Sequence, residues 1–431
     1  MSFNPFEQRG ISLDQSFESW TNAYPVPYHK DEVDPYTKVR IILMNGTELE
    51  AERFSHRFNR SCTDMELRRE LALIRRIEQQ QQKKLALLKP ANESILEHTI
   101  SYEQLAVDLT AILAQREPDC YVKAALDFAL LEDFDHLYRY ANLLEMESGV
   151  FAERLVGGYT EIMPGRPTVA GHRHPFDNVR RFLDKKAAMT TKLAAMIITA
   201  AEQQTMNYYM NVVNLYPTDI GRRLYQEIGL IEEQHVTQYE SLQDPNSTWL
   251  ENLLLHEYVE CYLYWSCYMD ESSSYVKSIW EEHLLMEISH LKKAAELLKK
   301  YEGKEVCEVI PDPVFPERLS FHQNIEYVRG VLRDTVQYTA KDADYLDVAE
   351  LPEDASYWTL QKQLNANPLT VPSHAVINKY LCRNGIDYRY EVAPHPIGEL
   401  QGRRRDNITV GRTALDIPQA RFECNPVCGE T

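Results

Sequence analysis

Apolar residues recur at three- and four-residue spacing from about Thr63 to Lys300, a stretch in which Gly and Pro are rare. This spacing puts apolar side chains on one face of a helix and predicts a mainly α-helical domain over residues 63–303. The helices are expected near 63–88, 92–116, 119–148, 177–215, 218–243, 249–270 and 273–301. Residues 149–176, which contain Gly157-Gly158, Pro164 and Pro167, are expected to form a long connection between helices.

The segments on either side of this domain have a different pattern. Within residues 1–62, two short segments, 38–44 and 47–51, flank Asn45-Gly46, and an Asn-Gly pair favours the type I′ turn of a β-hairpin. The N-terminal arm is therefore predicted to contain a β-hairpin. Residues 304–431 are rich in Pro and Tyr with weak periodicity, which predicts a largely irregular C-terminal extension or a small mixed subdomain.

The amino-acid composition limits the classes of binding partner that are expected for this protein. The 431 residues carry 65 Asp+Glu against 46 Lys+Arg, a formal net charge of -19. Nucleic acids and anionic membranes bind clustered positive charge, so neither is expected as a partner. The longest apolar run is shorter than the ~20 residues of a membrane span, and the first residues lack a signal-peptide pattern, so a cytoplasmic protein is expected.

Three predicted helical hairpins share one spacing of charged residues. In each, a Glu is followed 30 positions later by an acid, and a His follows three positions after that acid. The hairpins lie at about 92–148, 177–243 and 249–301, and the residues are Glu103, Asp133 and His136, then Glu202, Glu232 and His235, then Glu257, Glu287 and His290.

Helix geometry gives this spacing a structural meaning. Fifteen helical residues span ~22 Å, and a turn lies midway between each Glu and its acid, so the two carboxylates return to one level on neighbouring helices. The three-residue step puts the acid and the His on one face of the second helix. Two facing hairpins would supply four carboxylates and two imidazoles, the ligand set of a dinuclear metal site in a bundle core.

The pattern Glu…Glu-x-x-His…Glu…Glu-x-x-His resembles the ferritin-like superfamily of di-iron and di-manganese carboxylate proteins over roughly residues 92–303. The resemblance implies a four-helix bundle that binds two Fe or Mn ions, with the acid of each acid-x-x-His bridging the ions and each His binding one. It also implies an oxidoreductase that reacts with O2 or peroxide and with an unknown reductant or substrate.

Three hairpins compete for two places, and two pairings stay open. Pairing the second hairpin with the third gives glutamate at all four carboxylate positions: Glu202, Glu232, Glu257 and Glu287. Pairing the first with the second makes residues 149–176 the long crossover of a ferritin-like fold, but places the shorter Asp133 at a bridging position. The remaining hairpin would be a relic or would form a second site across a homodimer.

Two other functions fit the same residues. One is the handling or storage of iron without turnover of an organic substrate, which requires a large assembly. The other is a metal-free helical scaffold in which hydrogen bonds satisfy the buried acids and histidines.

Overall fold

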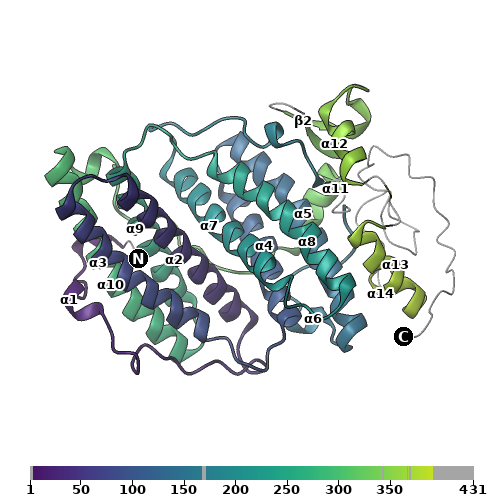
Figure 1. Cartoon of the computed structure of the whole chain (residues 1–431), viewed down its shortest axis with the longest axis horizontal. Helices are drawn as coiled ribbons and strands as arrows, with labels where there is room; N and C mark the ends of the chain where they lie inside the picture. The colour runs from purple at the N-terminus through teal and green to yellow at the C-terminus, as the bar shows by residue number, and fades with distance from the viewer. Residues whose placement is uncertain (1–2, 167–170, 342–343, 366, 368–369, 392–431) are drawn as a thin grey trace.

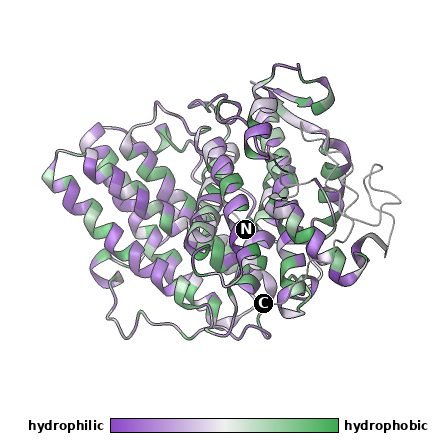
Figure 2. Cartoon of the chain, turned by 45° about the vertical axis from the view of Figure 1, so that its right-hand side comes forward, coloured by the Kyte–Doolittle hydropathy of each residue, from purple (hydrophilic) through white to green (hydrophobic). Residues whose placement is uncertain are grey.

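The computed structural model of the chain describes residues 3–166, 171–341, 344–365, 367 and 370–391. These residues form a mainly helical protein with one two-stranded antiparallel sheet. Polar and hydrophobic residues are interspersed along the helices (Figure 2). Within the described ranges, no helix combines the length and the apolar character needed to cross a membrane.

The long helices of the described chain pack as two groups of four (Figure 1). The central group is contiguous in sequence apart from its connections and consists of α4 (Ile95–Arg116), α5 (Cys120–Ser148), α7 (Met189–Val212) and α8 (Asp219–Glu240). The split group takes two helices from each side of the central group in the sequence: α2 (Pro35–Ser61), α3 (Met65–Leu87), α9 (Trp249–Asp270) and α10 (Ser274–Glu302).

Local sequence signals define the ends of these helices. Ser94 and Thr248 begin α4 and α9 with capping boxes, in which the side chain three positions later bonds back to the cap residue. Gly149 and Gly303 end α5 and α10 in the left-handed conformation, at φ 69° and 67°. A residue with a side chain is strained there, so these glycines are efficient helix stops.

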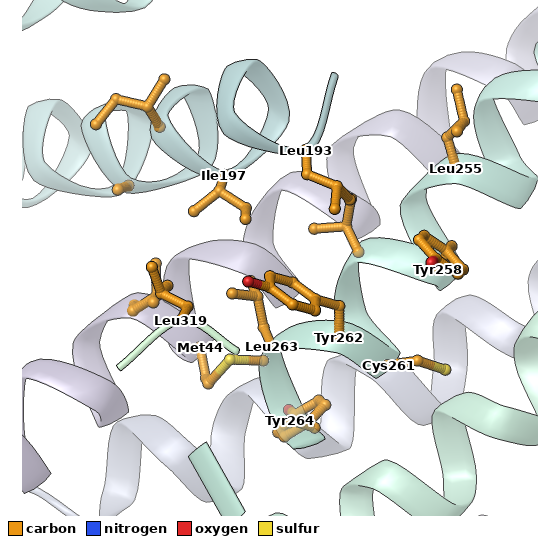
Figure 3. Close-up of a cluster of buried hydrophobic side chains, with 14 of the residues drawn as sticks. Met44, Leu193, Ile197, Leu255, Tyr258, Cys261, Tyr262, Leu263, Tyr264 and Leu319 are labelled. Atoms are coloured by element: carbon orange, nitrogen blue, oxygen red, sulfur yellow. The ribbon is translucent and has the colours of Figure 1, made fainter. Parts of the chain in front are cut away.

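The two groups meet in a shared hydrophobic core. Met44 of α2, Ile197 of α7 and Leu263 of α9 come together between them (Figure 3). All three side chains are almost fully buried, and burial of each contributes about 2 kcal/mol to folding. Two layers of helices are therefore joined over a continuous apolar interface.

The predicted β-hairpin in the N-terminal arm is wrong, because residues 35–61 form helix α2. The carboxylate of Asp34 caps this helix and Pro35 occupies its first turn, both of which favour a helix start. Gly46 lies inside α2 where α7 approaches closely: a Cβ atom there would lie 3.0 Å from the backbone oxygen of Ala200 and 2.8 Å from Cβ of Gln204. The glycine is used for helix packing, not for a turn.

The other predicted helices are present with small differences at their ends, except that α7 begins at Met189 and not near 177. Residues 175–177 form a single 3-10 turn, and the chain then runs irregularly to α7. In this stretch the backbone N–H of Leu183 donates to the carbonyl of Leu242, 2.8 Å away, so it is bound to the end of the central group. The long connection is therefore longer than predicted, and it includes the short helix α6 (Ala152–Leu155).

The described part of the C-terminal extension is a small mixed region, and the short helix α1 (Leu13–Ser16) packs on α3 and α10 at the other end of the chain. The elements of the extension are α11 (Ile325–Thr335), β1 (Tyr338–Lys341), β2 (Asp344–Asp347), α12 (Ser356–Leu364), α13 (Pro372–Asn384) and α14 (Tyr388–Glu391). Strands β1 and β2 pair antiparallel, and α11 and α13 pack on the central group. The prediction of an irregular segment over residues 392–431 lies outside the described residues.

Candidate metal centre

The central group brings together all six residues predicted from the first and second hairpins. Ligand atoms of Asp133, Glu202, Glu232 and His235 lie within 4.8 Å of one another, and so do those of Glu103, His136 and Glu232. Each of these side chains is at most 1 % exposed. Glu232 belongs to both sets, so the arrangement consists of two adjacent groups of ligand atoms that share one carboxylate.

The shared carboxylate lies between the two imidazoles. Oε1 of Glu232 is 2.9 Å from Nδ1 of His136, and Oε2 is 3.2 Å from Nδ1 of His235. Neither contact has the alignment of a hydrogen bond. Carboxylate and imidazole thus face the same small region of space, as ligands of a common ion do.

The other nitrogen of His235 is held by a residue that the spacing did not predict. Nε2 of His235 lies 2.6 Å from Oε2 of Glu132, which is itself buried. A carboxylate on Nε2 fixes the proton there and leaves Nδ1 free to bind a cation. Nδ1 is 3.4 Å from Asp133 and 3.6 Å from Glu202, so His235 points its free nitrogen into the cluster.

Glu132 in turn is stabilised by a buried arginine from the long connection. Burial opposes its charged form, but Arg173 and His235 outweigh burial and lower the pKa of Glu132. Arg173 is 1 % exposed, and its guanidinium donates to Oε1 of Gln238 over 3.0 Å. The sequence signal for Glu132 is its position next to Asp133, but helix periodicity alone does not tell which of two adjacent acids faces the core.

Burial and mutual repulsion set the charge of the remaining acids. Burial, reinforced by the neighbouring Glu232, raises the pKa of Glu103 well above its ordinary value, and burial together with Glu202 does the same for Asp133. Burial also raises the pKa of Glu202, to about 7. Glu232 differs, because the two imidazoles overcome the effect of burial and lower its pKa. Burial and mutual repulsion thus disfavour the charged forms of Glu103, Asp133 and Glu202, and a cation bound between them would favour those forms.

Buried polar atoms without hydrogen-bond partners provide a test of whether a metal fits. Among the cluster residues, such atoms include both carboxylate oxygens of Glu202 and Glu232, both ring nitrogens of His136, Oδ1 of Asp133 and Nδ1 of His235. A buried polar atom without a partner costs about 1–3 kcal/mol, more if it is charged. The donor set is therefore the kind that a bound cation completes.

The third predicted hairpin lies elsewhere. Glu257 on α9 and Glu287 and His290 on α10 belong to the split group, so the pairing of the second hairpin with the third is not the one present. Their neighbours are Glu48 of α2 and Glu78 of α3, which the sequence reasoning missed. The same spacing could have found them, because Glu78 follows Glu48 by 30 positions and Gln81 follows Glu78 by three.

Comparison with known protein families, with curated proteins and with solved structures found no match. A function for this chain is therefore inferred from the geometry and chemistry of its buried side chains.

Proposed function

We propose that the central group is a ferritin-like bundle holding a dinuclear Fe or Mn centre, and that the protein is an oxidoreductase that reacts with O2 or peroxide. One observation carries this proposal: the carboxylate of Glu232 faces His136 through one oxygen and His235 through the other, inside a ring of buried acids. A carboxylate that lies between two nitrogen ligands is placed to bridge two adjacent ions, one beside each imidazole.

The charges of the site suit two divalent ions. Glu103, Asp133, Glu202 and Glu232 supply four negative charges when deprotonated, and two divalent cations supply four positive charges. The negative charge of Glu132 is balanced separately by Arg173. Mixed carboxylate and imidazole ligands are compatible with Fe and Mn, and soft thiolates are missing from the described ligand groups.

In such a centre, some residues would bind the ions and others would orient these ligands. Asp133, Glu202 and His235 would hold one ion, Glu103 and His136 the other, and Glu232 both. Glu132 keeps the proton of His235 on Nε2, and Tyr209 donates its hydroxyl proton to Oε1 of Glu103. A bound pair of Fe or Mn ions supplies the redox equivalents for O2 or peroxide, which these side chains do not supply by themselves.

A metal-free scaffold is the competing explanation, because the raised pKa values of Glu103 and Asp133 would let both stay neutral in the folded protein. The two explanations differ in metal content. Purified full-length protein is loaded anaerobically with Fe²⁺ or with Mn²⁺. We expect the Glu232→Gln variant to bind about two ions per chain fewer than the wild type. The loaded Fe²⁺ protein should consume O2, measured with an oxygen electrode, and the Glu232→Gln variant should not.

Glu233→Gln is the matched control for this experiment. Glu233 is the next residue of α8 and is exposed, so the same change there removes a charge without touching the cluster. Equal metal content in the Glu232→Gln and wild-type proteins would support the scaffold and contradict the proposal. Hundreds of Fe ions in a large assembly would instead indicate storage.

A further inference from the structure

The split group encloses a second set of buried acidic and histidine side chains that the proposed function does not use. They come from all four of its helices: Glu48 of α2, Glu78 of α3, Glu257 and Glu260 of α9, and Glu287 and His290 of α10. None of these side chains is more than 2 % exposed. Five carboxylates in one bundle interior need compensation, since an unpaired buried charge is very costly.

The ligand atoms of this set again form two adjacent groups. Those of Glu78, Glu257 and His290 lie within 4.8 Å of one another, and those of Glu257, Glu260 and Glu287 do so as well. Glu257 belongs to both groups. Five of the six residues therefore lie in two groups that share one carboxylate, as in the central group, and Glu48 lies outside both.

Glu260 provides independent evidence for a ligand. Its side chain is 1 % exposed, and neither of its carboxylate oxygens has a hydrogen-bond partner. Oε2 of Glu257, Oε2 of Glu78 and Nε2 of His290 also lack partners. Burial raises the pKa of Glu260 well above its ordinary value, and the nearby acids raise it further. A carboxylate that faces other carboxylates and no donor is complemented by a cation.

The two oxygens of Glu287 have neighbours at the positions equivalent to those of Glu232 in the central group, although at Glu287 both contacts are hydrogen bonds. Oε1 of Glu287 accepts from Nε2 of Gln81 at 2.6 Å, and Oε2 lies 3.0 Å from Nδ1 of His290. Glu232 lies close to His136 in place of Gln81, and to His235 in place of His290.

A tyrosine contact repeats in the same way. The hydroxyl of Tyr264 donates to Glu48 as that of Tyr209 donates to Glu103, and each tyrosine follows the cluster acid of its own helix, Glu257 or Glu202, by seven positions. Matched contacts at matched positions indicate a built site and not a chance gathering of acids.

The second set differs chemically from the first at three equivalent positions. Gln81 occupies the position equivalent to His136, and Ile77 the position equivalent to Glu132, which orients His235. Glu260 is an additional acid at the position equivalent to Thr205. The second set thus has one more carboxylate, one less imidazole and no carboxylate partner on the outer nitrogen of its histidine. Oxygen-rich sites favour hard cations such as Mn²⁺ over softer transition metals.

We propose that the split group contains a second, separate metal site that binds the hard divalent cation Mn²⁺ through Glu78, Glu257, Glu260, Glu287 and His290. It does not depend on the redox role proposed for the central group. Glu48 and Gln81 lie beside these ligands and are not among the proposed ligands themselves.

The test uses the full chain with the first site removed. Apo Glu232→Gln protein is titrated with Mn²⁺, and bound metal is measured by equilibrium dialysis and elemental analysis. At least one Mn²⁺ per chain should remain. Adding Glu260→Gln or Glu287→Gln should weaken this binding by more than the ~10- to 100-fold that loss of an outer partner of a ligand costs.

Glu281→Gln is the matched control, because Glu281 is exposed on α10 and the change should leave Mn²⁺ binding intact. Absence of Mn²⁺ binding in folded Glu232→Gln protein overturns the proposal, as does unchanged binding in both added variants. His235→Ala removes the first site equally well if Glu232→Gln protein does not fold, with folding judged by circular dichroism.

Discussion

Gln81 donates a hydrogen bond from Nε2 to Oε1 of Glu287 over 2.6 Å, in the place where His136 faces Glu232 in the central group. Since imidazole is a stronger ligand for softer transition metals than an amide, this one residue is expected to separate the metal preferences of the two groups.

The Gln81→His variant should therefore bring the split group closer to the central group in metal preference. We expect its preference for Co²⁺ over Mn²⁺ to rise on the order of tenfold, equivalent to about 1.4 kcal/mol, in competition titrations of Glu232→Gln protein. Gln79→His is the control, because Gln79 is exposed on the same helix. A preference unchanged by Gln81→His would mean that position 81 does not contact the ion.

Glu132 should control the affinity of the central group without binding the ion. Glu132→Gln keeps the shape of the side chain but removes the charge that holds the Nε2 proton of His235. Metal affinity should fall about 10- to 100-fold at the central group and stay unchanged at the split group, measured by competition with a chelator of known affinity. Equal losses at both groups would point to a general structural defect.

Gly46 should not tolerate a side chain despite its position within a helix. Alanine normally stabilises a helix by about 1 kcal/mol relative to glycine, but a Cβ at position 46 would press against Ala200 and Gln204 of α7. We expect Gly46→Ala to lower the free energy of unfolding by about 1–3 kcal/mol in urea denaturation.

Gly330→Ala in α11 provides the comparison, because the nearest atom to its Cβ would be a guanidinium nitrogen of Arg333 at 3.7 Å. That variant should be neutral or slightly more stable. Similar losses in the two variants would show that contact with α7 is not the cause.

Stability should depend on pH through Glu227, a buried acid of α8 that belongs to neither ligand set. Burial raises its pKa from 4.5 to about 7, although the backbone N–H and hydroxyl of Ser373 both donate to its Oε2. The folded state therefore keeps a proton between these pH values that the unfolded state releases, so this contribution to stability is full below pH 4.5 and is lost as pH rises to 7.

The loss from this residue is at most about 3 kcal/mol. The Glu227→Gln variant has an amide that does not titrate at this position. Its free energy of unfolding should therefore decline less than that of the wild type between these pH values. Denaturant titrations of metal-free protein over this range make the comparison. Parallel profiles for the two proteins would assign the pH dependence to other buried acids.

Most of the helical architecture could be predicted from the spacing of apolar residues and from local end signals. Helices α3, α8 and α10 alternate buried and exposed positions, whereas α4, α5 and α9 are buried on nearly all sides. Helix α2 could not be predicted in this way, since Asn45-Gly46 gives a strong local turn signal and the reason for Gly46 is the approach of α7. Local propensity was overridden by packing between residues far apart in sequence.

The candidate site could also be predicted from the sequence only in part. The level of each acid and histidine follows from helix spacing, so Glu232 and His235 were within reach of sequence reasoning. The choice of partner hairpin depends on tertiary packing, which periodicity within one hairpin does not encode. Glu132 and Arg173 matter through their orientation toward His235, and only the folded chain defines that orientation.

The order of helices along the chain has a consequence for synthesis. Helices α2 and α3 leave the ribosome early, but α9 and α10, which cover their acidic inner face, emerge only after the whole central group. During that interval Glu48 and Glu78 lack their neighbours from α9 and α10. Closure of the last two helices over them therefore completes the second ligand set, so a truncated chain that ends before α9 would lack three of its carboxylates and its only histidine.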